Sequence, residues 1–106
     1  MEGGVQMIKV MIKRRAPREK ETELLSLITQ LRSAASQQPG YISGETLHGT
    51  DKPEDYLVIS IWDSDYFWKK WTATDERKEM QGKIDKLLGG PTEYEIYQYP
   101  KKTMTP

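Results

Sequence analysis

The chain has 106 residues, no cysteine, and equal numbers of Lys plus Arg and of Asp plus Glu, 16 of each. This length suits a single domain, and a composition of 36% hydrophobic and 30% charged residues is typical of a folded globular protein. The balanced charge gives no reason to expect nucleic acid or an anionic membrane as a partner, and the missing thiols exclude disulfides, cysteine nucleophiles and thiolate-bound metals.

Residues 5–14 alternate in character and predict the first strand. One face of this strand carries Ile8, Val10 and Ile12, and the other carries Met7 and Met11. The basic run at 13–15 is interpreted as the solvated end of the strand.

A helix is predicted to begin at Ala16-Pro17, where proline is tolerated and nearby glutamates complement the helix dipole, and to end near Gln37. Its apolar stripe consists of Leu24, Leu27, Ile28, Leu31 and Ala35. Residues 41–48 predict a second strand, with Gly44 as a candidate bulge. The turn residues at 49–54 connect it to the next strand as a hairpin.

Residues 56–62 predict a central strand that is apolar on both faces and therefore covered on both. Alternate side chains point in opposite directions, so one face has Tyr56, Val58 and Trp62, and the other has Leu57, Ile59 and Ile61. The acidic and hydroxyl residues at 63–65 then predict a helix cap, followed by a short amphipathic helix. All three tryptophans, at 62, 68 and 71, lie here, where an aromatic pocket is expected.

A further helix is predicted after a cap at Thr74-Asp75, and it ends at the glycines 89 and 90. Its apolar residues are Met80, Ile84, Leu87 and Leu88, and the charged run at 75–79 is interpreted as its solvated surface. Gly82 is interpreted as a position that another backbone or a ligand approaches closely. Residues 92–99 predict the last strand, and the termini at 1–4 and 100–106 are expected to be flexible.

This order of elements predicts an α+β fold, a ferredoxin-like βαββαβ sandwich with an antiparallel four-stranded sheet, in one domain over residues 5–99. The helices can cover only one face of such a sheet. The other face carries Met7, Met11 and one side of the central strand, a large apolar patch for a monomer. We therefore expect a homodimer in which two sheets close face to face.

Several segments in this order resemble the antibiotic biosynthesis monooxygenase family. They are residues 38–45 (QPGYISGE), residues 56–64 (YLVISIWDS), Trp71 before an acidic cap, and residues 91–97 (PTEYEIY). The resemblance spans roughly residues 5–99. It implies a dimeric α/β barrel with a pocket between helices and sheet.

The resemblance implies two chemistries. The quinone-forming branch oxidises aromatic polyketides with O₂ and no cofactor. This chain is similar to it in having Trp62, but it has Val58 and Trp68 where that branch has an Asn and a Tyr. The haem-degrading branch is similar in the position of Trp71, but Gln81 stands where that branch has a histidine, and this chain has no Asn. Without that imidazole no proximal iron ligand is evident.

Packing is the alternative to chemistry for several of these residues. Tryptophan more often fills a core or an interface than reacts, and this applies to Trp62 and Trp71. Trp68, flanked by lysines, is expected to resist complete burial and to form a pocket wall or a dimer contact. The single histidine, His48, is interpreted as exposed and without function, and no spacing of acidic residues indicates a metal site.

We predict a homodimeric monooxygenase that oxidises an aromatic or quinol-type small molecule with O₂ and without cofactor or metal. Its candidate catalytic residues are Trp62 and Trp71, and its candidate substrate-binding residues are Tyr66, Phe67, Trp68 and Gln81. Such an enzyme requires an apolar cavity between helices and sheet. The alternative is a non-catalytic dimeric module that binds a small apolar ligand or another protein, and the third hypothesis is haem degradation.

The expected setting is the cytoplasm of a bacterium, without a membrane partner. No stretch approaches the length and apolarity of a membrane span. The first residues also lack the basic and apolar regions of a secretion signal.

Overall fold

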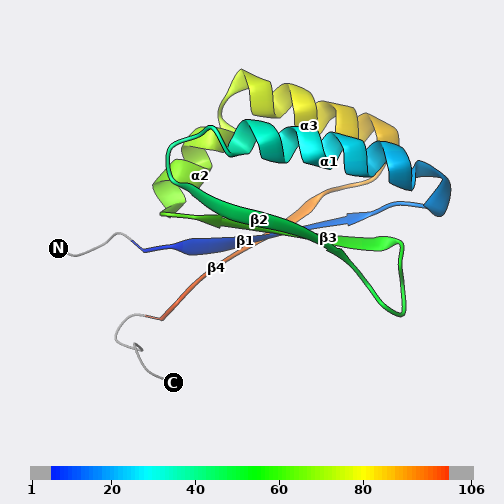
Figure 1. The fold of residues 1–106 in the computed structure, drawn as a ribbon, viewed down its shortest axis with the longest axis horizontal. Helices are drawn as coiled ribbons and strands as arrows, with labels where there is room; N and C mark the ends of the chain where they lie inside the picture. Colours follow the sequence, from blue (N-terminus) through cyan, green and yellow to red (C-terminus); the bar gives the residue numbers. More distant parts are fainter. Residues whose placement is uncertain (1–5, 101–106) are drawn as a thin grey trace.

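A computed structural model describes residues 6–100 of the chain, which form a sheet with helices on one side (Figure 1). The elements in chain order are β1 (Ile8–Arg15), the 3-10 turn η1 (Arg18–Lys20), α1 (Glu21–Ala35), β2 (Tyr41–His48), β3 (Asp55–Trp62), α2 (Asp65–Thr72), α3 (Asp75–Leu88) and β4 (Glu93–Gln98). The predicted βαββαβ order is confirmed. Apart from Pro100, the termini predicted to be flexible lie outside the described residues, as does Val5, the predicted start of the first strand.

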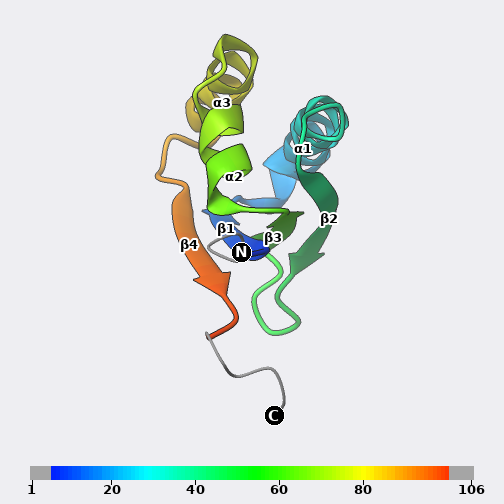
Figure 2. The same ribbon diagram turned by 90° about the vertical axis from the view of Figure 1, so that its left-hand side faces the viewer.

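The four strands form one antiparallel sheet in the order β2-β3-β1-β4. In the central pair, Ile8 lies opposite Trp62 and Arg15 lies opposite Asp55. Directly opposed residues project to the same face, so this register sets which side chains meet under the helices. Figure 2 shows α1 on the β2 side of the sheet and α2 with α3 on the β4 side, both above the same face.

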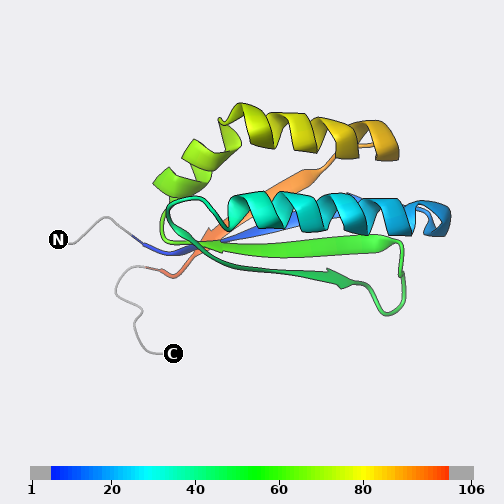
Figure 3. The same cartoon turned by 45° about the horizontal axis from the view of Figure 1, so that its top comes forward.

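The core lies between the helices and this face of the sheet. The buried apolar side chains from the strands are Ile8, Val10, Ile12, Tyr56, Val58 and Trp62, and those from the helices include Leu24, Ile28, Leu31, Ala35, Trp68, Trp71 and Ile84. The predicted assignment of the two faces of β1 and β3 is therefore confirmed. The helices α1 and α3 also pack against each other, side by side above the sheet (Figure 3).

Helix α1 begins later than predicted, at Glu21 rather than at Ala16-Pro17. The backbone N–H of Ala16 donates to the carbonyl of Glu54, and residues 18–20 form a tighter 3-10 turn. Both interactions hold this segment outside the regular helix. The helix ends at Ala35, two residues before the predicted end at Gln37. Ser64 does precede α2, but its side chain makes no capping hydrogen bond.

The prediction of a bulge at Gly44 is wrong. The irregularity in β2 falls between Tyr41 and Ser43, whereas Gly44, the predicted bulge, pairs regularly with Ser60. A Cβ added to Gly82 would meet nothing within 4 Å, so no backbone from residues 6–100 approaches this position, and its approach by a ligand stays a prediction. By contrast, Gly89 ends α3 as predicted, in the left-handed conformation with φ of 66°.

The opposite face of the sheet carries no helix, as Figure 2 shows. Alternation along the strands places Leu47 and Tyr97 on this open face, where both are exposed, together with the partly exposed Leu57, Ile59 and Ile61. The expectation of an apolar patch on a single chain is confirmed. In the described part of the chain, no helix is long and apolar enough to cross a bilayer.

Candidate functional site

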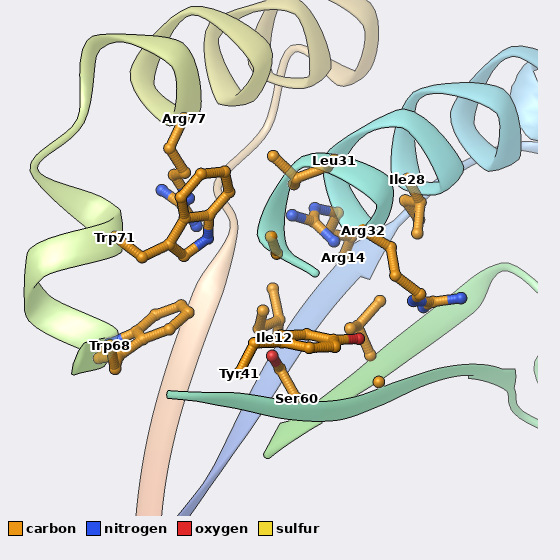
Figure 4. A pocket seen from close by; sticks show the side chains of 13 residues that line it. Ile12, Arg14, Ile28, Leu31, Arg32, Tyr41, Ser60, Trp68, Trp71 and Arg77 are labelled. Carbon is orange, nitrogen blue, oxygen red and sulfur yellow. The ribbon is translucent and has the colours of Figure 1, made fainter. Parts of the chain in front are cut away.

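A cavity of about 40 Å³ lies between the helices and the covered face of the sheet (Figure 4). A water molecule takes about 30 Å³ in the liquid, so this space holds a small molecule such as O₂ or one polar group of a larger ligand. Its walls come from three strands and all three α-helices. The lining residues are Ile12, Arg14, Ile28, Leu31, Arg32, Ala35, Tyr41, Gly44, Val58, Ser60, Trp68, Trp71 and Arg77.

Aromatic side chains form one side of this cavity. Trp68 and Trp71 lie three residues apart on α2, which places both on its inner face. Trp62 lies behind them and is completely buried, with its ring centroid 5.9 Å from that of Trp68 and 6.4 Å from that of Trp71. Its Nε1–H donates to the hydroxyl of Ser60 over 2.8 Å, and Ser60 in turn lines the cavity. Trp62 does not line the cavity itself, but it contacts Ser60 and Trp71, which do.

Trp68 is 6% exposed, so the prediction that it resists burial is wrong. The guanidinium of Arg77 lies over its ring at 5.6 Å, and the ring of Tyr94 lies 6.1 Å away. These two neighbours help to bury Trp68, while the flanking lysines contact Asp65 and Tyr66 instead. Trp68 forms part of the cavity wall, which is one of its two predicted roles.

Two buried arginines also line the cavity, and Arg77 lies beside the tryptophans (Figure 4). Arg14 is 4% exposed, and its Nη2 donates to Oε1 of Gln81 over 3.0 Å. Arg77 is 7% exposed, and its Nη2 donates to the hydroxyl of Tyr94 over 2.8 Å. The Nε atoms of both arginines are buried and have no hydrogen-bond partner in the described structure.

A third arginine lies at the edge of the cavity. Arg32 reaches from α1 to β2, where its Nη2 donates to the hydroxyl of Thr46. A Cβ on Gly44 would lie 2.8 Å from the hydroxyl of Tyr41 and 3.1 Å from Nε of Arg32. The absence of a side chain at Gly44 therefore leaves room for both polar groups. Burial raises the pKa of Tyr41 above its ordinary value, so its hydroxyl stays protonated at neutral pH.

The residues lining the cavity include three guanidinium groups and no carboxylate. Loss of water around Arg14 lowers its pKa to about 10, and the charge of Arg77 acts in the same direction, whereas Tyr94 and Asp85 oppose it. Asp85 is exposed and reaches Arg14 only through Gln81. The guanidinium group is a cation, so three of them make the cavity a region of positive potential.

Gln81, predicted to bind substrate, is a bridge beside the cavity and not part of its wall. Its Oε1 accepts from Arg14, and its Nε2 donates to Oδ1 of Asp85 over 2.8 Å and to the hydroxyl of Thr92 over 3.0 Å. Every polar atom of this side chain is engaged. In this geometry Gln81 positions Arg14.

Two other predicted substrate-binding residues also lie away from the cavity. Tyr66 is 63% exposed, with Lys70 over its ring. Phe67 is half-buried against Gly40, where an added Cβ would come within 2.5 Å of the ring. Of the predicted site residues, Trp68 and Trp71 are brought together at the cavity, with Trp62 directly behind. The substrate contacts of Tyr66 and Phe67 stay predictions.

The sequence interpretation missed the arginines. The run at 13–15 was interpreted as solvated, which is wrong for Arg14, and the run at 75–79 was interpreted as helix surface, which is wrong for Arg77. A signal was present, because Arg14 continues the inward alternation of Ile12. In α3, Arg77 likewise shares helical spacing with the buried Ile84.

The arrangement does not fit haem. Gln81 has no free atom for iron, and His48 is exposed in the β2–β3 hairpin, near the carbonyl of Pro53 and stacked on Tyr56. The cavity is also far smaller than a porphyrin. Within residues 6–100, no group of three His, Cys, Asp or Glu side chains is placed to hold a metal ion.

A wider depression of about 730 Å³ lies at the hairpin end of the sheet. Its lining includes Lys13 and Leu57, whose register places them on the open face, together with exposed hairpin residues. The buried side chains of Arg14 and Tyr56 also line it. The cavity under the helices is the better candidate for a ligand site, because tryptophan rings and the buried groups of Arg14 and Arg77 converge on it.

The sequence profile of the family described as antibiotic biosynthesis monooxygenase matches residues 7–83. No curated protein sequence matches the chain significantly.

Several solved structures share the fold. A conserved protein from Methanosarcina mazei is 22% identical, with a TM-score of 0.82 over 90% of this chain and 94% of that one. A candidate antibiotic biosynthesis monooxygenase from Nitrosomonas europaea is 12% identical, with a TM-score of 0.80 over 97% and 99%. SnoaB, a cofactor-independent oxygenase from Streptomyces nogalater, is 15% identical, with a TM-score of 0.80 over 93% and 97%. At these identities the likeness shows the fold alone.

Proposed function

The chain belongs to the antibiotic biosynthesis monooxygenase family, and from this membership and its cavity we propose that it is a cofactor-independent monooxygenase acting on an aromatic, quinol-type small molecule. The observation that carries the proposal is the cavity under the helices, which combines tryptophan rings with buried cations. An aromatic substrate that reacts as its anion needs both kinds of group.

The reaction needs no redox group from the protein if the substrate is sufficiently electron-rich. A phenolate or enolate gives one electron to O₂, and the resulting substrate radical and superoxide combine to form a carbon-bound peroxide. Loss of water from the peroxide leaves a carbonyl group, so a CH₂ group and O₂ become C=O and H₂O. The substrate supplies all the electrons, one oxygen atom enters it, and the other leaves as water.

The protein residues supply binding, desolvation and electrostatics for this reaction. The guanidinium groups favour the deprotonated substrate and stabilise superoxide beside it. Trp68 and Trp71 pack against the aromatic ring and exclude water. The hydroxyls of Tyr41 and Ser60 offer hydrogen bonds at the opposite wall. Trp62, which contacts Ser60 and Trp71 from behind, is in this proposal a positioning residue.

Entry of an aromatic molecule requires the cavity to widen, since sites for such ligands measure about 300–1,000 Å³. Arg32 and Tyr41 are only partly buried, so their side chains are the parts of the wall that can move outward at least cost. In the proposed complex, one polar group of the substrate fills the present cavity. Its ring then displaces these two side chains at the edge.

We also propose that the protein forms a homodimer through the open face of the sheet, supported by the exposed apolar residues there. Closing two sheets face to face would bury Ile59 and Leu57, which a single chain leaves partly exposed. The bacterial and cytoplasmic setting expected from the sequence stays a prediction.

The test of the oxygenase is O₂ consumption with 1,8-dihydroxyanthrone, whose CH₂ group lies between two phenol rings. We expect uptake above the uncatalysed rate, one O₂ per substrate, unchanged by a metal chelator, and slowed about tenfold or more by Trp71→Phe. Tyr99→Phe, which removes an exposed hydroxyl outside the cavity, serves as the matched control. Circular dichroism checks that both variants fold.

The second candidate function, a non-catalytic binding module, is favoured by the small volume of the present cavity. Binding of the anthrone without any O₂ uptake above the uncatalysed rate would overturn the oxygenase and support this module. An absorbance change on addition of haem would show that haem binds, contrary to the conclusion that this site does not fit it.

A further inference from the structure

Buried cations in folded proteins are normally paired with carboxylates, because an unpaired buried charge is costly. Even exposed cations of the described chain form such pairs: Arg15 pairs with Asp55 at 3.3 Å, and Lys13 pairs with Glu95 at 3.0 Å. Neither Arg14 nor Arg77 forms such a pair within residues 6–100, although both are far more deeply buried than these surface residues. The cavity therefore contains positive charge without an anion.

From this imbalance we propose that the cavity binds the carboxylate of an aromatic acid, held by Arg14 and Arg77 and closed over by Arg32. The planar guanidinium group matches a planar carboxylate, to which it can donate two parallel hydrogen bonds. The inference names the substrate class of the proposed oxygenase and rests on that function for turnover. Binding of the acid is nevertheless measurable without turnover.

Unsatisfied hydrogen-bond donors support this inference independently of charge. The Nε–H groups of Arg14 and Arg77 are buried and have no acceptor in the described structure. Buried donors in native proteins are almost always satisfied, so these two N–H groups favour a ligand that brings acceptor oxygens. A carboxylate in the 40 Å³ cavity supplies acceptor oxygens as well as negative charge.

The two buried guanidinium groups are held in place before any ligand arrives. The guanidinium of Arg77 contacts the rings of Trp68 and Tyr94, at 5.6 Å and 5.4 Å, and the residue starts from the α3 cap, where Thr74 accepts from its backbone N–H. Arg14 is fixed by Gln81, which is itself held by two further hydrogen bonds. Preorganised donors lose little entropy when an anion binds.

Packing interactions alone do not account for this geometry. Arg77 contacts two rings and donates to Tyr94 through Nη2, but these interactions leave its Nε unsatisfied. Likewise, Gln81 accepts one hydrogen bond from Arg14 but carries no charge to balance it. A phenolate alone would neutralise one of the three cations, whereas a phenolate that also bears a carboxylate neutralises two.

The test compares 1,4-dihydroxy-2-naphthoate with its methyl ester by calorimetry under anaerobic conditions, at neutral pH. The two probes share a ring and differ in one charge. Hydrogen bonds to a charged group are roughly twice as strong as neutral ones, so we expect the acid to bind about tenfold tighter or more.

Arg14→Gln and Arg77→Gln are expected to remove the preference for the acid. Arg15→Gln is the matched control, because Arg15 is the next residue of β1 but faces the open side and is exposed. If either buried substitution prevents folding, Arg32→Gln at the partly exposed edge replaces it and is expected to reduce the preference at least threefold. Thermal unfolding confirms which variants fold.

The outcomes separate this inference from the proposed oxygenase. Equal binding of acid and ester, or no binding of either, would overturn the carboxylate site, as would a preference that survives in folded Arg14→Gln and Arg77→Gln proteins. Strong binding of the acid without O₂ uptake would support the anion site and count against the oxygenase. Equal oxidation of both probes, with no preference in binding, would leave the oxygenase standing and reject the carboxylate.

Discussion

Arg14 and Arg15 are neighbours on β1, yet they lie in opposite environments. Arg14 is buried under the helices without a carboxylate, whereas Arg15 is exposed and pairs with Glu54 and Asp55. On the covered face of the sheet, apolar side chains pack against the helices, but the buried guanidinium group of Arg14 has no carboxylate partner in the described part of the chain. On the open face, charge has partners and apolar side chains such as Ile59 do not. The covered face therefore has cations that an anion could pair with, and the open face has apolar side chains that a second apolar surface could cover.

Trp62→Ala and Ile61→Ala test the packing side of this comparison at adjacent positions on opposite faces. Trp62 is 0% exposed and contacts three aromatic rings, so its truncation is expected to lower the free energy of unfolding by about 3–5 kcal/mol. Ile61 is partly exposed, and in a dilute monomer its truncation should cost about 1 kcal/mol or less. Urea unfolding measures both. Equal losses would contradict the assignment of the core to the covered face.

Ile59→Glu tests the missing apolar surface. A charge at the centre of the open face should weaken dimer formation by about 2 kcal/mol or more while the monomer stays folded. Leu25→Glu, at a 37%-exposed position on α1, is the control and should not affect association. Sedimentation velocity over a range of concentrations measures the dissociation constant. A wild-type protein that remains monomeric throughout would refute the proposed interface.

Gly44→Ala and Gly82→Ala compare a glycine at the cavity with one at the surface. The new methyl group at Gly44 must displace Tyr41 and Arg32, so we expect weaker binding of the aromatic acid and a loss of stability of about 1 kcal/mol. At Gly82 the methyl group meets open space in a helix, so a gain of up to about 1 kcal/mol is expected. Unchanged ligand binding in Gly44→Ala would show that these two side chains do not border the site.

Tyr56 provides the smallest predicted effect, through pH. Burial, helped by the hydrogen bond that its hydroxyl donates to Glu21, raises the pKa of Tyr56 from 10.0 to about 12. The unfolded chain therefore loses this proton first, and the stabilising contribution, complete below pH 10, is lost as the pH rises towards 12. Tyr56→Phe should show a shallower decrease in stability over this range.

Urea unfolding at pH 9, 10 and 11 on both proteins measures this effect. The substitution also leaves Glu21 without its partner, so the two slopes are compared rather than the absolute stabilities. Parallel slopes would show that Tyr56 ionises with the same pKa in the folded and unfolded chains.

Much of the fold followed from local patterns. The two-residue period of β1 and β3 correctly divided Ile12 and Val58 from Met11 and Ile59, because neighbouring side chains of a strand point to opposite faces. The apolar stripe of α1 was likewise predictable from its spacing. Local patterns failed at the helix start, where the hydrogen bond from Ala16 to Glu54 joins residues far apart in the sequence.

The candidate site was predictable only in its aromatic half. Trp68 and Trp71 come from one short helix, so their sequence spacing already places them on one face. The cationic half combines residues from β1, α1 and α3. Arg14 and Arg77 are far apart in the sequence, so their spacing does not predict that they lie close together. Runs of charged residues usually lie in solvent, and this general tendency gave the wrong interpretation at both positions.

The sequence by itself determined which elements form, their order, and which face of each strand is apolar, because these properties depend on residues near one another in the chain. Only the tertiary structure decided that the two buried arginines donate hydrogen bonds to Gln81 and Tyr94. It also decided that, among residues 6–100, no carboxylate lines the cavity beside them. Burial of a charge depends on what packs around it from distant segments. For that reason the arginine-lined cavity emerged only once α1 and α3 were placed over the sheet.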